Sequence, residues 1–317
     1  MVAVLVNYGL PASNNPFNFK FRPYSGPNIL YTPMKLYITS LFCIFFLSVF
    51  SQHKTILNSK TKQPVPYAGV YVTNYMGASA DDRGVFTLPK LHDSTMVRLS
   101  SVGYKDLVVR SGKLADTILM DEEVYKLDEV KIYATGKKVV KVDKLKRSSI
   151  QLSMCPPYKT RFVGKTFLYN ETYKETLFIK SVSIRTTSDQ TNGLLNVRFF
   201  SLNDKGEPGE SIYNHNNVFS VQEGEQITTK IDVSHYMIPF PEKGLCVGVE
   251  TMLLEQNKVT LYYDTKAGEM KEVIIYEPAL KVSELDKDEP KRTWCYNGEK
   301  WIVNEKHNLV MQLELMN

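Results

Sequence analysis

The stretch VFTLPKLHDSTMVRLSSVGYKDLVVRSGKLADTILM, residues 85–120, decides the fold class of this chain. It contains four short apolar segments, each rich in β-branched or aromatic residues and each too short for a helix. These segments are Val85–Leu88, Met96–Leu99, Leu107–Val109 and Ile118–Met120. They recur at the spacing of about 8–12 residues that is typical of sandwiches. The stretch therefore predicts short strands of a β-sandwich.

The same pattern extends in both directions along the chain. Thr55–Leu57 and Val70–Val72 precede the stretch, and Val130–Tyr133 follows it. Between the apolar segments lie turn-forming residues such as Asp81–Gly84. Seven such strands predict a small Greek-key sandwich over residues 52–134.

Four motifs in this segment point to a known family. They are QPVPYAGVYV (63–72), SADDRGVF (79–86), SVGY (101–104) and LDEVKI (127–132). Their order resembles the carboxypeptidase regulatory-like family over about residues 53–134, although Ala80 stands where that family usually has threonine. The resemblance implies a transthyretin-like β-sandwich of accessory type, found beside carboxypeptidases and ahead of the plugs of TonB-dependent receptors.

The sequence shows neither of the companions that such a domain usually has. A zinc carboxypeptidase needs a histidine with a glutamate three residues later, and none of the five histidines has one. A receptor barrel needs many more alternating strands than the rest of the chain could supply. The resemblance therefore implies a fold and an accessory role, but no activity.

An apolar run, Leu36–Phe50, follows Lys35 and is closed by the small residue Ser51. A positive charge, a short apolar stretch and a small-residue exit predict a signal peptide over residues 34–51. We therefore expect the export machinery to recognise this segment and to deliver the protein to the periplasm, the outer membrane or the medium.

The residues before this run have a different character. Residues 1–33 are polar, show no periodicity and precede Met34, so we interpret them as an upstream overextension with Met34 as the initiator. The alternative is that segment 36–50 stays uncleaved and tethers the protein to the membrane. That segment is shorter than the roughly 20 residues that a membrane span needs.

One basic segment follows the first predicted domain. Its cationic residues are Lys137, Lys138, Lys141, Lys144, Lys146 and Arg147. We interpret residues 135–161 as a solvated basic linker, with attachment to anionic lipid or glycan as the alternative. No aromatic residue lies among these charges to stack on bases, so nucleic acid is not an expected partner.

Residues 162–317 continue the β pattern. Apolar and polar residues alternate in Ile227–Val233, Leu245–Val249 and Leu309–Leu315. A period of two predicts strands with one face buried and one face in water. We therefore predict a second antiparallel sandwich, similar to a jelly roll, and an all-β fold of two β-sandwich domains.

Both tryptophans of the chain lie in the segment WCYNGEKW, residues 294–301. Its Asn-Gly pair predicts a two-residue hairpin turn, which places Trp294 opposite Trp301 with Tyr296 beside them. Such rings could form a platform for a sugar ring, and these three residues are our candidate ligand-binding residues. The simpler alternative is a cross-strand aromatic pair that packs the core, worth about 0.5–1.5 kcal/mol.

The sequence contains no constellation that predicts catalysis. It lacks a Gly-x-Ser-x-Gly elbow, a Gly-rich phosphate loop and a Cys-x-x-Cys pair. Glu250 is an acid on an otherwise apolar strand, which a salt bridge at a strand edge explains more simply than glycoside hydrolysis. We expect no enzyme activity, no catalytic residue and no cofactor.

Two further features have a structural and a chemical interpretation. Asp81 and Asp82 could bind calcium, but adjacent acids in a turn more simply accept hydrogen bonds from turn amides, so we expect no metal site. Cys246 and Cys295 could form a disulfide outside the cytoplasm, or remain buried thiols.

These observations predict an exported, non-catalytic binding or scaffolding protein of the cell envelope. Its partner would be a glycan or a cell-surface protein, recognised through the second sandwich. The alternative is an accessory or degenerate enzyme of extracellular polymer breakdown, with carboxylates supplied by the second domain.

Overall fold

The computed structural model describes residues 53–73, 77–123, 138–148, 150–154, 162–213, 215–264, 269–297 and 300–317, which belong to one compact unit, Ser51–Asn317. Regular structure in these residues consists of β-strands and short 3-10 helices, so the prediction of an all-β sandwich fold is confirmed. The 3-10 helices are η1 Ser111–Lys113, η2 Glu171–Tyr173, η3 Ser234–Tyr236 and η4 Glu255–Asn257. The predicted signal peptide, residues 34–51, and the proposed overextension, residues 1–33, lie outside the described residues.

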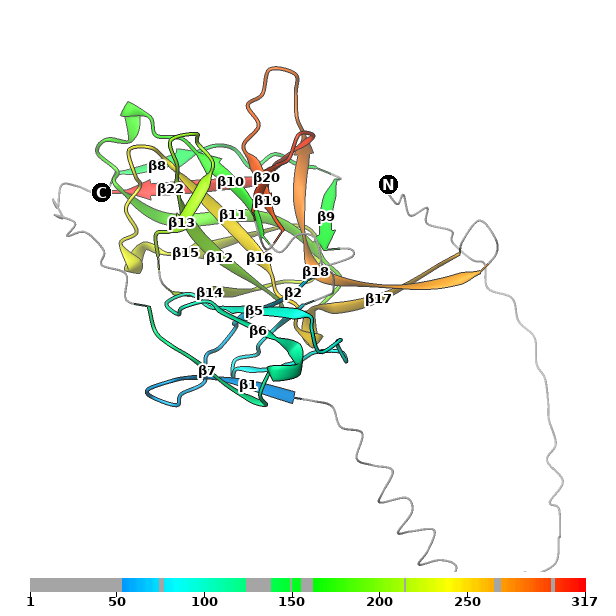
Figure 1. The fold of residues 1–317 in the computed structure, drawn as a ribbon. Coiled ribbons are helices and arrows are strands. Elements are labelled where there is room, and N and C mark those ends of the chain that lie inside the picture. The colour runs from blue at the N-terminus through cyan, green and yellow to red at the C-terminus, as the bar shows by residue number, and fades with distance from the viewer. Residues whose placement is uncertain are drawn as a thin grey trace, which may run out of the picture. The chain divides into compact units, whose positions relative to one another are not determined.

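A smaller sandwich is formed by the first seven strands, coloured blue to cyan-green in Figure 1. One sheet has the order β4-β1-β7 and the other the order β3-β2-β5-β6. The strands are β1 His53–Asn58, β2 Gly69–Val72, β3 Ala78–Ser79, β4 Val85–Thr87, β5 Met96–Ser100, β6 Leu107–Arg110 and β7 Thr117–Met120. All pairings are antiparallel except that of β1 with β7, which is parallel and departs from the antiparallel prediction.

The predicted strands of residues 55–120 all appear in this sandwich, and the short strand β3 is an addition. The predicted strand Val130–Tyr133 lies outside the described residues. Alternate side chains of the paired strands fill the core because strand side chains point to opposite faces. The core contains Ile56, Val70, Phe86, Leu99 and Ile118 among others.

The turn before β4 shows why its residues are acidic and small. The Asp81 carboxylate accepts hydrogen bonds from the amides of Arg83 and Val85, at 2.9 and 2.8 Å. Gly84 has a φ of +74°, and a Cβ there would meet the carbonyl oxygen of Ile56 at 2.5 Å. The structure thus gives Asp81 the turn-capping role.

A larger sandwich packs a seven-stranded sheet against an eight-stranded sheet. The first has the order β13-β12-β16-β10-β19-β20, and β14 also pairs with β12. Its strands are β10 Phe162–Phe167, β12 Gly193–Leu202, β13 Pro208–Ser211, β14 Asn217–Val221, β16 Leu245–Thr251, β19 Thr293–Tyr296 and β20 Trp301–Val303.

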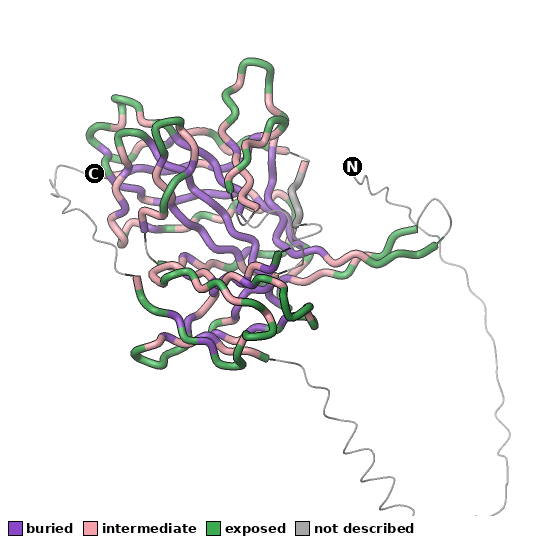
Figure 2. The backbone as a smooth tube through the Cα atoms, in the orientation of Figure 1, coloured by how far each residue is buried: buried purple, intermediate pink, exposed green. Residues whose placement is uncertain are grey.

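The second sheet has the order β17-β18-β11-β22-β8, with β15 on β11 and with β9 and β21 on β18. Its strands are β8 Val139–Val142, β9 Gln151–Met154, β11 Phe178–Ser188, β15 Gly224–Asp232, β17 Lys258–Asp264, β18 Met270–Glu284, β21 His307–Leu309 and β22 Met311–Met316. The core between the sheets includes Phe167, Ile184, Phe199, Val247 and Leu313. Burial in Figure 2 is concentrated in these central strands.

The prediction of one wet face fails for β16, whose residues are all buried. The inner face carries Leu245, Val247 and Val249 into the core. The outer face is covered as well, because Trp301 lies against Gly248 and because Glu250 forms a buried ion pair. The sheet therefore has a second buried layer that alternation alone did not predict.

The predicted basic linker, residues 135–161, contains two strands of the larger sandwich. β8 pairs with β22, with Val142 opposite Leu313, and β9 pairs with β18. Val142 is buried in the core, whereas the neighbouring Lys141 and Lys144 are exposed. The exposed lysines dominate the composition, which is why the segment resembles a linker in the sequence.

The outer part of the β17–β18 ribbon projects from the sandwich and is mostly exposed (Figures 1 and 2). Tyr262 is 65% exposed and Met270 is 72% exposed.

No helix within the described residues is long and apolar enough to cross a membrane.

Candidate functional site

The hairpin that carries both tryptophans has a different register from the predicted one. β19 and β20 pair Tyr296 with Trp301 and Trp294 with Val303. The connection runs from Asn297 to Lys300, where the Asn297 side chain accepts a hydrogen bond from the Lys300 amide at 2.9 Å. Because Asn297 opens the loop in place of occupying a central turn position, the placement of Trp294 opposite Trp301 was wrong.

Trp301 lies on the outer face of the seven-stranded sheet, over two glycines that face each other across β10 and β16. A Cβ at Gly164 would lie 3.3 Å from the indole, and one at Gly248 would lie 3.6 Å from it. The ring centroids of Tyr296 and Phe200 are each 5.2 Å from that of Trp301. Closer still to these Cβ positions are Cys246 Sγ, 2.6 Å from that of Gly164, and the Phe200 ring, 2.8 Å from that of Gly248, so the two glycines make room for several neighbours within an aromatic cluster.

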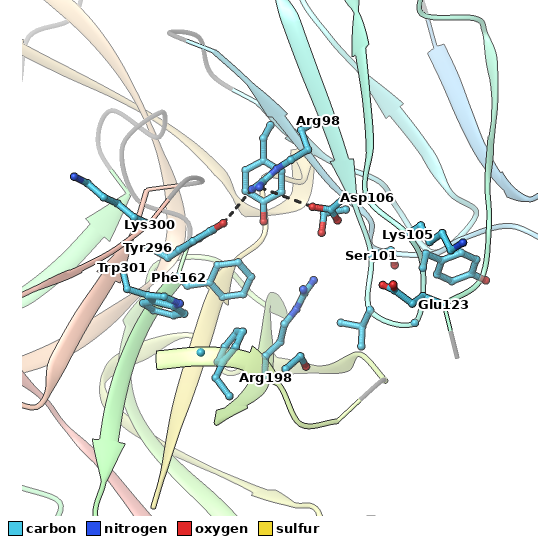
Figure 3. A pocket seen from close by; sticks show the side chains of 18 residues that line it. Arg98, Ser101, Lys105, Asp106, Glu123, Phe162, Arg198, Tyr296, Lys300 and Trp301 are labelled. Carbon is cyan, nitrogen blue, oxygen red and sulfur yellow. Dashed lines mark hydrogen bonds and ion pairs between the residues drawn. The ribbon is translucent and has the colours of Figure 1, made fainter. Parts of the chain in front are cut away.

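This cluster forms one wall of a cavity of about 700 Å³ between the two sandwiches (Figure 3). The lining residues are Tyr71, Arg98, Ser100, Ser101, Val102, Gly103, Tyr104, Lys105, Asp106 and Glu123 from the smaller sandwich, and Phe162, Arg198, Phe200, Gly209, Ser211, Tyr296, Lys300 and Trp301 from the larger one. Of the three candidate ligand-binding residues, Tyr296 and Trp301 line the cavity and Trp294 does not.

Arg98 enters the cavity from the smaller sandwich and is held on several sides. Its guanidinium lies 4.7 Å from the centre of the Tyr71 ring, and its Nη2 donates to the Tyr296 hydroxyl at 3.2 Å. The carboxylate of Asp106 is 3.8 Å from its Nη1. Burial opposes the charged form, but the Tyr296 hydrogen bond and nearby charges outweigh it, so the pKa of Arg98 is raised. Arg98 is thus a fixed positive charge at the cavity wall.

Arg198 enters the cavity from β12 of the larger sandwich (Figure 3). Only 9% of the residue is exposed, and its guanidinium lies 5.1 Å from the centre of the Phe162 ring. Its Nη2 is 3.1 Å from Oε2 of Glu250, which also accepts a hydrogen bond from Asn196 at 3.2 Å. The salt bridge predicted for Glu250 is present, but β16 is a central strand, so the predicted edge position was wrong.

The Arg198–Glu250 pair leaves part of the guanidinium without hydrogen bonds. Among the described residues, no acceptor bonds the buried Nε or Nη2 of Arg198 in hydrogen-bond geometry. Buried donors in proteins are nearly always satisfied, by protein, water or ligand. Arg198 is therefore an unusual cavity residue as well as half of an ion pair.

The sequence prediction missed both arginines. Arg98 alternates with apolar residues in β5, as any solvent-facing charge would, and nothing in the sequence places it beside Tyr296. Arg198 offered a signal, because it lies in the apolar run of β12 and Glu250 lies in that of β16. Two opposite charges in two otherwise apolar strands indicate a buried pair.

Other predicted features take no part in this cavity. Cys246 and Cys295 are both free thiols, so the disulfide alternative is not adopted. Burial raises the pKa of each thiol, which disfavours the reactive thiolate. Within the described part of the chain, no group of three or more His, Cys, Asp or Glu side chains could hold a metal ion.

The chain matches no protein-family model, no curated protein and no solved structure. The resemblance of residues 53–134 to the carboxypeptidase regulatory-like family therefore stays a prediction.

Proposed function

We propose that this protein is a non-catalytic binding protein of the cell envelope that recognises a glycan in the cavity between its two sandwiches. The observation that supports the proposal is the aromatic wall of that cavity, where Trp301 and Tyr296 are both half-buried. Flat aromatic faces pack well against the C–H face of a sugar ring. Serines and charged groups on the other walls could bond to its hydroxyls.

The rest of the cavity wall suits such a ligand. Ser100, Ser101 and Ser211 contribute hydroxyl groups, each able to donate and to accept a hydrogen bond. A volume of about 700 Å³ lies within the range of about 300–1,000 Å³ usual for small-ligand sites. It is enough for a short oligosaccharide, and the partly open wall would let a longer chain continue into solvent.

The proposed location rests on the segment 34–51, which has the character of a signal peptide. Sequencing the N-terminus of the protein isolated from its host tests this part of the proposal. A mature chain that starts at Gln52 supports export with cleavage. An intact leader on a membrane-bound protein would favour the tethered alternative, and an intact leader in the cytosol would contradict export.

The binding proposal can be tested by the fluorescence of single tryptophans. Because the chain has two tryptophans, the Trp294→Phe variant retains only the indole that lines the cavity. We expect glycans selected on an array to change the emission of this variant. The matched Trp301→Phe variant retains only Trp294, which does not line the cavity, and its emission should stay unchanged.

The Trp301→Ala variant separates binding from packing. Because Trp301 also packs on the sheet, the variant should be less stable in either case, so binding is measured below its melting transition. A wall that serves for recognition predicts at least about tenfold weaker glycan binding by the folded variant. Aromatic packing alone predicts the loss of stability and no selected glycan. An assay for new reducing ends accompanies the titration, since their release would favour the alternative of a polymer-degrading enzyme.

A further inference from the structure

Among the described residues that line the cavity, positive side chains outnumber negative ones by four to two. Its cationic lining residues are Arg98, Lys105, Arg198 and Lys300, whereas its acidic ones are Asp106 and Glu123. Neutral sugars need no such excess, because hydroxyl groups are recognised equally well by neutral amides and hydroxyls. The sign of the lining therefore favours a ligand with negative charge.

We infer that the glycan recognised in this cavity is an acidic one, whose oxyanion binds between Arg98 and Arg198. The inference rests on the proposed function, since it names the class of sugar that the same cavity takes. A uronate carboxylate and a sulfate ester share the chemistry required, which is a set of oxygens that accept several N–H donors at once.

The two arginines have the same local architecture although they come from different sandwiches. Each guanidinium lies over an aromatic ring, Arg98 over Tyr71 and Arg198 over Phe162. Stacking fixes the plane of a guanidinium and leaves its edge, where the donors lie, available for hydrogen bonding. Because these side chains are ordered before binding, a ligand would not have to bear the entropy of ordering them.

One carboxylate lies beside each of the two arginines. Asp106 is 3.8 Å from Arg98, which is longer than a charge-assisted hydrogen bond. Glu250 lies beneath Arg198 and is itself not a cavity residue. Nε and Nη2 of Arg198 make no hydrogen bond among the described residues, but both atoms are buried and Nη2 lies 3.1 Å from the Glu250 carboxylate, so a ligand would meet the rest of the guanidinium, which lines the cavity.

Placed together, these groups match the two parts of an acidic sugar. The faces of Trp301 and Tyr296 would hold the ring, and the arginine edges would hold the charged substituent. A site with a flat apolar wall and two oriented guanidinium groups discriminates a charged ring from a neutral one by the strength of the hydrogen bonds it offers.

The test uses ligand pairs that differ only in charge. Oligosaccharides of galacturonate, glucuronate and mannuronate are each compared with the same oligosaccharide after its carboxylates have been reduced to hydroxymethyl groups, and sulfated galactose oligosaccharides form a separate arm. We expect at least one acidic oligosaccharide to bind about tenfold or more tightly than its neutral counterpart. Affinity for the acidic form should fall with added salt, because screening weakens charge attraction.

Two single substitutions test whether the preference for acidic oligosaccharides arises in the cavity. Arg98→Gln should remove most of the preference for the acidic form. Arg110→Gln makes the same change of charge at an exposed residue of β6 that does not line the cavity, and it should keep the preference. Melting curves of both variants confirm that each is folded.

The outcomes distinguish this inference from the proposed function. If neutral and acidic oligosaccharides bind equally and Trp301→Ala weakens both, the cavity binds glycans but the inference about charge is wrong. If no oligosaccharide of any arm binds the parent protein, both proposals fail. A preference for the acidic form that survives Arg98→Gln in a folded protein would overturn the placement of the oxyanion.

Discussion

Two regions of the larger sandwich hold buried ion pairs, and they satisfy their charges in different ways. Lys165 projects from β10 across the core and donates to the carbonyl oxygens of Leu309 and Met311, at 3.0 and 3.3 Å. Its ammonium is also 3.0 Å from the Asp143 carboxylate. Arg198, on the outer face of the same sheet, has Glu250 as its ion-pair partner and two buried nitrogens without hydrogen bonds among the described residues.

The difference separates a structural charge from one suited to recognition. An ammonium has three donors, and three named acceptors surround Lys165. These contacts join the two sheets, since β10 belongs to one sheet and β21 and β22 to the other. The three acceptors around Lys165 match its three donors and Lys165 does not line the cavity, whereas Arg198 does line it.

The largest expected effect is that of Glu250→Gln. Removing this carboxylate leaves Arg198 buried and charged, and a guanidinium cannot release its proton to escape the cost. We expect the free energy of unfolding to fall by about 3 kcal/mol in urea titrations. The control is Glu255→Gln, whose carboxylate is exposed and pairs with Lys258. Equal effects of the two variants would show that the Arg198–Glu250 pair has no special importance.

Asp143→Asn should have a smaller effect, because a lysine can lose its proton where an arginine cannot. Burial lowers the pKa of Lys165, and Asp143 offsets part of that shift. We expect the variant to lose about 2 kcal/mol at neutral pH. Between the lowered pKa of the folded state and 10.5, the unfolded chain binds more protons, so stability should rise with pH.

The pH dependence of the stability of Asp143→Asn tests whether Lys165 is the group responsible. Its free energy of unfolding should rise more steeply with pH, over the range below 10.5, than that of the parent, since the neutral amide that replaces the Asp143 carboxylate no longer favours the charged lysine. The Lys165→Met/Asp143→Asn double variant should lose the added slope. A slope that is unchanged in the single variant would contradict the assignment to Lys165.

The smallest effect is expected for an ion pair on the outer face of the eight-stranded sheet in which only the lysine is exposed. Lys230 is 2.6 Å from Glu314, and their side chains are 52% and 10% exposed. The hydrogen bond from Lys230 is the main cause of the lowered pKa of Glu314. Lys230→Met should therefore cost at most about 0.5 kcal/mol after solvent screening.

The acid dependence of that small effect follows from the direction of the pKa shift. The contribution of Glu314 is present above the unfolded-state value near 4.5 and is lost as the pH falls through the lowered value of the folded state. The difference between parent and Lys230→Met should thus shrink as the pH falls below 4.5 in acid titrations followed by circular dichroism. A difference that grows in acid would exclude this origin.

The sequence predicted strands well and their surroundings poorly. Short apolar segments such as Met96–Leu99 and Ile118–Met120 form strands as predicted. Such segments are too short for a stable helix, and β-branched residues favour the extended conformation. The side chains that cover the outer face of β16 come from other parts of the chain, so the sequence of β16 itself does not predict them. Alternation in that strand indicated water on one face, and Trp301 in fact lies there.

The candidate site shows the same limit. Tyr296 and Trp301 could be singled out because both lie next to a recognisable turn, yet the turn type set the wrong partner for Trp294. Arg98 and Arg198 lie far apart in the sequence and approach one cavity from different sandwiches. No local sequence pattern predicts that two such distant residues line the same cavity, because this depends on how the two sandwiches pack.

The pairing of β8 with β22 has a consequence for how this chain folds. It joins residues near the start of the larger sandwich to residues near its end, so almost the whole domain forms the loop that this contact closes. Closing a long loop lowers the conformational entropy of the chain before the β8–β22 contacts contribute any stabilisation. Because β22 is almost the last segment to be synthesised, this contact can form only when the rest of the larger sandwich has already been made.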